Sequence, residues 1–418
     1  MIDEPVTTAS PGTAEHQLQW LVDASLRAPL PVGEIRRHLA PALLDASGGP
    51  DAVNAALAAL GPLTLAGTLT KRPDHVQAVV AGRTAGYRIA VHVDADGRVD
   101  AMRLTPDEPE PASWAEIDAL LRGLGSRVSF AAAHVEPDGR CRVVHGLDAD
   151  TPRPIGSAFK LYVLGALAQA VADGHASWDE RLAIRDDHKS LPSGTLQNRP
   201  AGDTLPLSEY ADHMISISDN TATDHLIHRL GRDAVVRQLS LFGHRQPDSN
   251  VPFLTTKAFF QLKGAPDVGG TQQYLALPVH RRITAVLELE QLPLPEVRET
   301  WSQPRHIDQI EWFASPADIC RAYAGLLQLD QPRIGHALSL NDDGLHLDPT
   351  RFPETWYKGG SEPGVVSLHY LARTSAGRAL VTSLMVSDPT TSPDVIDVAA
   401  RGQSVMRGAF HLLALPEG

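Results

Sequence analysis

Hydrophobic and polar positions follow a helical spacing at the start of the chain and then change to strict alternation. Between His16 and Leu60 the spacing predicts two or three helices, among them 17–28 and 51–60. The alternating segments predict antiparallel strands at 63–69, 76–80, 87–93 and 99–104. Helices followed by a short curved sheet indicate a small α+β domain over residues 15–105.

A charged, proline-rich segment separates this domain from the rest of the chain. Residues 106–115 include three prolines with acidic residues between them, which is typical of a stiff linker. A chain of 418 residues also exceeds the roughly 250 to 300 residues that one core usually serves. We therefore predict a second domain over residues 116–418.

The second domain begins and ends with strand patterns and is mostly helical in the middle. Ser113 is predicted to cap a helix that ends near Leu124, with Glu116 completing a capping box. Strands are predicted at 128–134, 140–145, 355–358, 365–372 and 378–387, and a last helix at 394–413. The order predicts one antiparallel sheet built from both ends of the domain, with helices beside it and a site between them.

The most apolar predicted helix carries a lysine. Residues 158–172 are apolar on nearly every face, so we expect an interior helix in which Lys160 loses hydration and becomes neutral more easily. Ser157 lies one turn earlier on the same face, where we expect its hydroxyl to hydrogen-bond to that amine. Free N–H groups at the start of the helix favour an oxyanion. Ser157 is thus a candidate nucleophile and Lys160 its base.

Ser-x-x-Lys by itself more often means a capping serine and a solvated lysine. The chain uses lysine sparingly, at only six positions against 31 arginines, which favours a special role for the buried one. Two further patterns support this interpretation. Ser218-Asp219-Asn220 interrupts a predicted helix pair, and Lys358-Gly359-Gly360-Ser361 follows a predicted edge strand.

Composition limits the kinds of partner that this protein is expected to bind. A net charge of −13 argues against nucleic acid and anionic membranes, and no apolar run reaches the roughly 18 residues of a membrane span. The first residues lack the features of a signal peptide, so we expect a cytoplasmic protein. Cys141 and Cys320 are expected to be inert buried thiols. The expected partner is a small-molecule substrate, with no cofactor, and composition makes no prediction of the oligomeric state.

Ser-x-x-Lys, Ser-Asp-Asn and Lys-x-Gly occur here in the order and at the spacing found in serine β-lactamases and penicillin-binding proteins. From about residue 115 to its end the chain resembles that family, and class A in particular. The resemblance implies a class A β-lactamase-like domain, an antiparallel sheet flanked by helices, that hydrolyses an amide or ester through an acyl-enzyme.

The resemblance also implies a role for each matching residue. Ser157 would be acylated, and Lys160 would help to deprotonate it. Ser218 would pass the proton to the leaving atom, and Asn220 would hold a substrate amide. Lys358 would polarise Ser218 and attract a substrate carboxylate.

The strand after this lysine would complete the site. The backbone N–H groups of Ser157 and Ser361 would form the oxyanion hole. Gly359 and Gly360, which lack side chains, would let the substrate approach the backbone closely, next to Ser361. Gly359 departs from the family, which commonly has Thr or Ser there to contact the β-lactam carboxylate. Ser361 is expected to replace that hydroxyl in part, with weaker affinity for ordinary penicillins.

A second departure concerns deacylation. Class A enzymes carry a glutamate on a loop after Ser-Asp-Asn, whereas residues 238–286 contain no glutamate and only two acids, Asp248 and Asp267. We therefore expect weak classical β-lactamase turnover. An esterase that leaves the β-lactam ring intact and a non-catalytic binder of β-lactam or cell-wall-like ligands remain alternatives.

The two-domain arrangement is similar to proteins encoded in clavulanic acid biosynthesis clusters and their actinobacterial relatives. The segments 156–162, 185–194 and 252–256 carry this likeness. It implies a cystatin-like or ketosteroid-isomerase-like first domain and a role in antibiotic metabolism.

A metal site was also considered. His225 and His228 lie three positions apart on a predicted helix, but no third ligand accompanies them. We therefore interpret both as solvated histidines and expect no metal.

Overall fold

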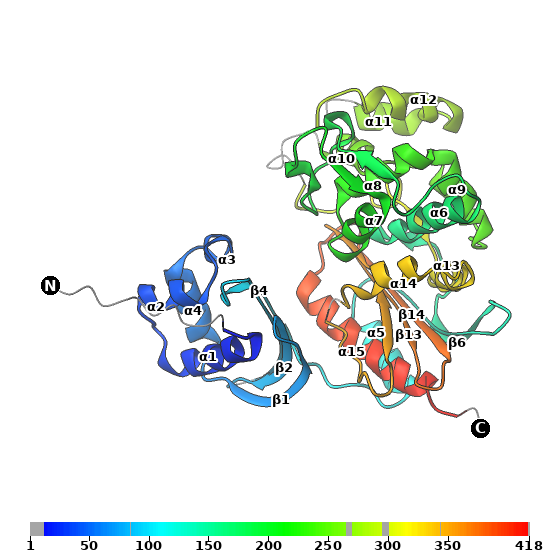
Figure 1. Ribbon diagram of the computed structural model, residues 1–418. Coiled ribbons are helices and arrows are strands. Elements are labelled where there is room, and N and C mark those ends of the chain that lie inside the picture. Colours follow the sequence, from blue (N-terminus) through cyan, green and yellow to red (C-terminus); the bar gives the residue numbers. More distant parts are fainter. Residues whose placement is uncertain (1–11, 84, 265–269, 295–300, 343, 417–418) are drawn as a thin grey trace. The chain divides into compact units, whose positions relative to one another are not determined.

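The computed structural model describes residues 12–83, 85–264, 270–294, 301–342 and 344–416 (Figure 1). The chain divides into two compact units, Met1–Pro109 and Glu110–Gly418. The first unit is built around one hydrophobic core and the second around two, and each unit is described by itself below.

The first unit contains four helices followed by a four-stranded antiparallel meander in the order β1-β2-β3-β4. Its elements are α1 (Ala14–Arg27), α2 (Val32–His38), α3 (Pro41–Ala46), α4 (Pro50–Leu60), β1 (Thr64–Lys71), β2 (His75–Ala81), β3 (Gly86–Val93) and β4 (Val99–Pro106). All four predicted strands are confirmed, and the helical stretch holds four helices rather than two or three. A cystatin-like fold for this unit stays a prediction.

The second unit contains one large antiparallel sheet in the order β11-β13-β14-β5-β6, with β12 also paired to β13. Its strands are β5 (Arg127–Val135), β6 (Cys141–Leu147), β11 (Glu354–Tyr357), β12 (Gly360–Glu362), β13 (Val365–Arg373) and β14 (Ala379–Ser387). Strands from the two ends of the unit therefore share one sheet, as the sequence predicted. The short pairs β7 (Arg153–Pro154) with β10 (Phe313–Ala314) and β8 (Arg181–Ala183) with β9 (Thr204–Pro206) were not predicted.

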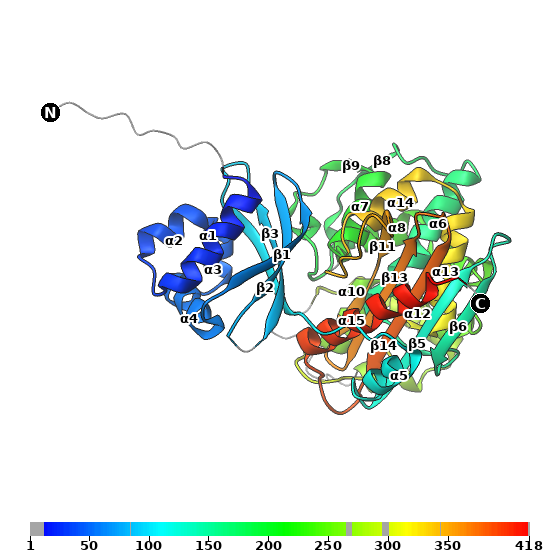
Figure 2. The same cartoon turned by 90° about the horizontal axis from the view of Figure 1, so that it is seen from below.

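The helices of the second unit pack on both faces of this sheet (Figures 1 and 2). On one face lie α5 (Trp114–Arg122) and α15 (Val395–Leu413). The other face meets the helical region, which contains α6 (Lys160–Ala172), α7 (Leu207–Ser216), α8 (Asn220–Leu230), α9 (Arg232–Leu241), α10 (Thr256–Gly264), α11 (Gly270–Ala276), α12 (Val279–Leu289), α13 (Pro316–Gln328) and α14 (Pro332–Ser339). Three-ten helices lie at Gly156–Phe159, Asp186–His188, Leu196–Asn198 and Pro247–Asn250.

Alternation along the central strands explains how both faces are covered. On β13, Leu368 and Tyr370 face the core with α5 and α15, while Leu371 faces the helical region. Because successive side chains of a strand point to opposite faces, this almost wholly buried strand serves two cores at once. The interior sheet thus provides a rigid support on which a site can be built.

The predicted capping box on α5 is only half correct. The Ser113 side chain accepts a hydrogen bond from the Glu116 N–H at 3.3 Å, as expected for an N-cap. The Glu116 carboxylate, however, accepts from the Ala112 N–H at 2.8 Å instead of reaching the N–H of the capping residue.

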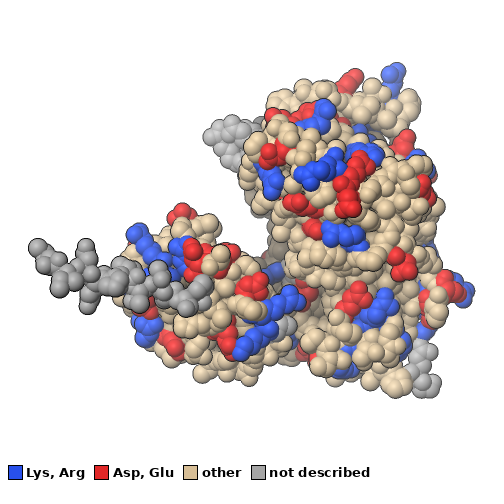
Figure 3. All heavy atoms as spheres, in the orientation of Figure 1, with Lys and Arg blue, Asp and Glu red and all other residues tan. Residues whose placement is uncertain are grey.

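Neither cysteine is ionised, and surface charges of both signs are mixed on the face shown in Figure 3. Cys320 is buried, as predicted, whereas Cys141 is only half-buried. Burial raises the pKa of Cys141 to about 12 and that of Cys320 well above its usual value, so both remain protonated. On the face drawn in Figure 3, basic and acidic side chains lie interspersed. None of the helices within the described ranges combines the length and the hydrophobicity needed to cross a membrane.

Candidate functional site

The predicted nucleophile lies on a tight turn rather than inside a regular helix. Residues Gly156–Phe159 form a three-ten turn, and α6 begins only at Lys160. Gly156 has φ +49°, and a Cβ there would lie 3.0 Å from the Ser361 nitrogen, so a side chain would be strained and crowded. The turn leaves Ser157 partly exposed in front of a buried helix.

Lys160 is fully buried, as predicted, and its amine is surrounded by oxygen atoms of the next motif. Its Nζ donates to the Ser218 carbonyl at 2.6 Å, to Ser218 Oγ at 3.0 Å and to Asn220 Oδ1 at 2.7 Å. Burial, followed by the nearby charge of Lys358, holds the pKa of Lys160 well below its usual value. A neutral amine at this position can accept a proton.

The expected hydrogen bond between this amine and the nucleophile is not observed. Within the residues that the structure describes, no hydrogen bond joins Ser157 Oγ to Lys160 Nζ, because Ser218 and Asn220 supply the partners of Nζ. The sequence spacing placed the two residues one turn apart but did not include the competing acceptors, which come from the connection between α7 and α8 and from the first residue of α8.

Ser218 lies between two amines. Its backbone has φ +56°, in the short connection between α7 and α8. Ser218 Oγ accepts from Lys160 at 3.0 Å and from Lys358 at 3.1 Å. Since its O–H can rotate, the same hydroxyl can also donate to whichever amine is neutral. Through the Ser218 hydroxyl, a proton can therefore move between the Lys160 amine and the Lys358 amine.

Asp219, which the sequence analysis did not single out, fixes this turn. Its carboxylate accepts from the N–H groups of Thr195 and Leu196 and, as the N-cap of α8, from Ala222. Gly194 approaches so closely that a Cβ would lie 2.2 Å from Asp219 Cγ. A buried carboxylate with three N–H donors is a rigid anchor.

Lys358 and Gly359 close the other side. Lys358 is 3% exposed and donates to the Gly359 carbonyl at 2.6 Å as well as to Ser218. A Cβ on Gly359 would lie 2.2 Å from the Tyr357 hydroxyl oxygen and 2.7 Å from the Ser367 carbonyl oxygen. The phenol of Tyr357, which stacks on Tyr370, thus takes the space of the side chain that the sequence analysis found missing.

The structure therefore brings together Lys160, Ser218, Asn220 and Lys358 through direct hydrogen bonds. The nucleophile turn meets β12 directly, because a Cβ on Gly360 would lie 2.4 Å from the Ser157 nitrogen. Ser361, the next residue of β12, is exposed.

Residues 238–286 contain two acids, Asp248 and Asp267. Asp248 is exposed, and Asp267 lies outside the described residues.

Asp224, one turn after Asn220 on α8, is fully buried and accepts from the Thr256 and Lys257 N–H groups at 2.7 and 2.8 Å. Burial raises the pKa of Asp224 to about 7. Asp224 therefore holds the first residues of α10 in place, and no sequence pattern predicted this role.

The histidines were misinterpreted as solvated. His225 is fully buried: its Nε2 accepts from the Arg185 N–H at 2.9 Å, and its Nδ1 donates to the Thr221 carbonyl at 2.7 Å. Burial lowers its pKa to about 4, so it is neutral. His228, half-buried, stacks on His188 with ring centroids 3.9 Å apart. No cluster of three possible metal ligands occurs in the described part of the chain.

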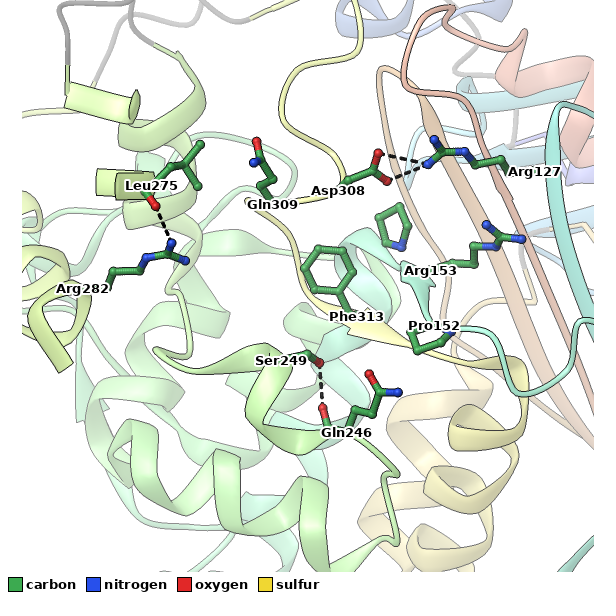
Figure 4. A pocket seen from close by; sticks show the side chains of 11 residues that line it. Arg127, Pro152, Arg153, Gln246, Ser249, Leu275, Arg282, Asp308, Gln309 and Phe313 are labelled. Atoms are coloured by element: carbon green, nitrogen blue, oxygen red, sulfur yellow. Dashed lines mark hydrogen bonds and ion pairs between the residues drawn. The ribbon is translucent and has the colours of Figure 1, made fainter. Parts of the chain in front are cut away.

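A separate pocket of about 520 Å³ lies near β7 and β10 (Figure 4). Three arginines line it, and each already has partners. Arg127 pairs with Asp308, Arg153 binds Ser129 Oγ, and Arg282 donates to the carbonyls of residues 275 and 277. None of the predicted site residues lines this pocket, and we assign no ligand to it.

Comparison with known proteins supports the fold. Residues 112–264 match the model of the beta-lactamase enzyme family, and residues 10–99 match a model described as the N-terminal part of the ORF 12 gene product. No curated protein matches the chain.

Three solved structures are similar to the second unit. A β-lactamase from Sphaerobacter thermophilus DSM 20745 is 22% identical, with 73% of this chain and 100% of that chain covered and a TM-score of 0.49. PBP-A, solved as an acyl-enzyme complex with penicillin G, is 18% identical over 73% and 99%, with a TM-score of 0.47. A mutant class A β-lactamase of the last common ancestor of Gram-negative bacteria is 16% identical over 72% and 97%, with a TM-score of 0.50. The second unit has a β-lactamase-like fold.

Proposed function

We propose that the protein is a serine hydrolase that forms an acyl-enzyme at Ser157 on a β-lactam-like amide or a small ester. The observation that carries the proposal is the buried amine of Lys160, whose pKa is lowered and whose Nζ is bonded to Ser218 and Asn220. Its fold and its three motifs support the same chemistry.

In the proposed reaction, Ser157 Oγ attacks the substrate carbonyl and its proton moves to the neutral Lys160 amine. The N–H groups of Ser157 and Ser361 stabilise the oxyanion. Ser218, bonded to both amines, delivers a proton to the leaving nitrogen or oxygen, and Lys358 restores the hydroxyl and attracts an anionic substrate group. Asn220 orients a substrate amide.

Intact-mass measurement after exposure to a fluorescent penicillin or an activated ester tests this proposal. We expect an adduct on the wild-type chain and none on Ser157→Ala. A folded wild-type protein that gains no mass from either reagent would falsify it.

An esterase that spares the β-lactam ring is the second candidate. The Tyr357 phenol beside Gly359 favours it, because the carboxylate-binding hydroxyl common in the family has no room there. Comparing nitrocefin turnover with p-nitrophenyl acetate turnover separates the two functions: an esterase turns over only the second reagent.

A binder without turnover is the third candidate, favoured by the missing acid after Ser-Asp-Asn. Such a protein would keep its affinity for a β-lactam when Ser157 is replaced by alanine, whereas a covalent enzyme would lose the adduct. For the serine hydrolase, the leading candidate, we further propose a role in antibiotic metabolism, a relationship to the clavulanic acid cluster proteins and a cytoplasmic location.

A further inference from the structure

Three ionisable side chains lie buried together behind β12. Lys263 of α10 has a fully buried side chain and forms an ion pair with Glu362, whose side chain is 7% exposed. Glu311 is also buried and interacts with the Glu362 carboxyl group, and among the described residues its Oε1 has no other hydrogen-bond partner. Trp301 donates from Nε1 to Glu362 Oε2 at 3.1 Å, and its ring lies 5.3 Å from Lys263 Nζ.

Charge balance assigns one proton to this cluster. Two carboxylates and one ammonium would leave an uncompensated buried charge, so one carboxyl group keeps its proton. Burial, and then the charge of Glu362, raise the pKa of Glu311 well above its usual value. Glu311 is therefore the neutral acid and donates to Glu362, which carries the charge that balances Lys263.

The cluster touches both segments that would form the oxyanion hole. Glu311 Oε2 accepts from the Gly156 N–H at 3.2 Å and from the Trp312 N–H at 2.8 Å. Gly156 directly precedes the nucleophile, and Glu362 directly follows Ser361. A continuous series of bonds thus runs from the nucleophile turn, through two carboxyl groups, to β12.

The nucleophile turn and β12 are also in direct contact. The Ser367 hydroxyl of β13 lies between them, 2.8 Å from the Ile155 carbonyl oxygen and 3.2 Å from the Gly360 carbonyl oxygen. The close approach of Gly360 to the Ser157 nitrogen leaves no room for a side chain between the two backbones. A displacement of either backbone therefore moves the amide of Ser157 relative to that of Ser361.

We propose that Glu311 is a positioning residue: through Gly156 on one side and Glu362 on the other, it fixes the distance and direction of the two oxyanion-hole amides. The inference rests on the proposed hydrolase function for its catalytic consequence. It does not require Glu311 to touch the substrate.

The test compares two variants of the full-length protein. Glu311→Gln keeps an acceptor for Gly156 and a neutral donor for Glu362, whereas Glu311→Met keeps the length and removes both. We expect Glu311→Met to lower the saturating acylation rate with p-nitrophenyl acetate roughly 100-fold, with the half-saturating concentration unchanged. Glu311→Gln should restore most of the lost rate. Equal rates in wild type and Glu311→Met, or equal losses in both variants, would overturn the inference.

Hydrogen exchange provides a readout that is independent of activity. Deuterium uptake should rise in Glu311→Met, and not in Glu311→Gln, in the peptides that cover residues 153–158 and 360–364. If the wild-type protein is not acylated at all, the proposed function fails, and unchanged exchange in Glu311→Met would then overturn this inference separately.

A milder variant covers the case in which Glu311→Met does not fold. Trp301→Phe removes the indole donor to Glu362 and keeps an aromatic ring beside Lys263. We expect a several-fold loss of rate and a smaller rise in exchange in the same two peptides. No change in either measurement would count against the role of the cluster.

Discussion

Lys160 and Lys263 are both fully buried, but their surroundings differ. Lys263 is bonded to the Glu362 carboxylate and lies beside two aromatic rings. Lys160 is bonded to a carbonyl, a hydroxyl and an amide oxygen, with a second amine, Lys358, across the same hydroxyl. In the part of the chain that the structure describes, no carboxylate hydrogen-bonds to Lys160.

The difference separates a structural lysine from a chemical one. A buried ammonium with a carboxylate partner stays charged and joins two elements. A buried amine that faces neutral oxygens and another amine is driven toward its neutral form, because burial and the charge of Lys358 outweigh the nearby carboxylates of Asp219 and Asp224. The same residue type thus supports packing in one place and proton transfer in the other.

The largest expected effect comes from removing the chemical lysine. Lys160→Met should lower the acylation rate by about 10³- to 10⁴-fold, because the proton of Ser157 loses its acceptor. Stopped-flow measurement with p-nitrophenyl acetate gives the rate. Lys71→Met, at an exposed ion pair of the first unit, serves as the control and should react like the wild type.

The same substitution at the structural lysine should act on stability. Lys263→Met leaves Glu362 buried without its cation, and we expect the free energy of unfolding to fall by about 3 to 5 kcal/mol. Urea denaturation measures it. A loss as large in Lys160→Met would contradict the distinction between the two lysines.

Lys358 tests the coupling between the two amines. Its positive charge lowers the pKa of Lys160, so Lys358→Met should let that pKa rise and move the acid limb of the acylation rate to higher pH. The rate above this limb should also fall by about 10- to 100-fold, since Ser218 loses a donor. An acid limb that stays in place would show that the two charges do not interact.

Asp224 should act in the opposite direction and more weakly. Its charge raises the pKa of Lys160, so Asp224→Asn should move the acid limb slightly to lower pH. Burial raises the pKa of Asp224 from 3.8 to about 7, so the folded protein holds more protons than the unfolded chain between these values. The wild type should therefore lose stability relative to Asp224→Asn as the pH rises through this window, by at most about 1.4 kcal/mol per pH unit. Denaturation series at pH 4 to 8 measure it.

Local patterns in the sequence predicted much of this molecule. Alternation placed the strands of the first unit within a few residues. Mostly apolar runs placed β13 and β14, whose two faces are both buried. Short motifs placed Lys160, Ser218 and Lys358, and the structure joins these three by direct hydrogen bonds.

Long-range polar contacts escaped the sequence analysis. Glu362 follows Lys263 by 99 positions, and only the fold brings them together. His225 carries no local sign of burial either, since its helix also bears His228 and Arg229 near its end. The hydrogen bond expected between Ser157 and Lys160 failed for a related reason: spacing along one helix says nothing about competitors from another.

The pairing of β5 with β14 has a consequence for biosynthesis. Val128 lies opposite Val386, so the sheet joins residues that leave the ribosome far apart in time. Until the last strand has emerged, β5 lacks a neighbour on one side, and Lys358 has no sheet from which to reach Ser218. The nascent chain would therefore remain without its proton-transfer geometry through most of translation, and the last strand and α15 would complete the sheet and its covering together.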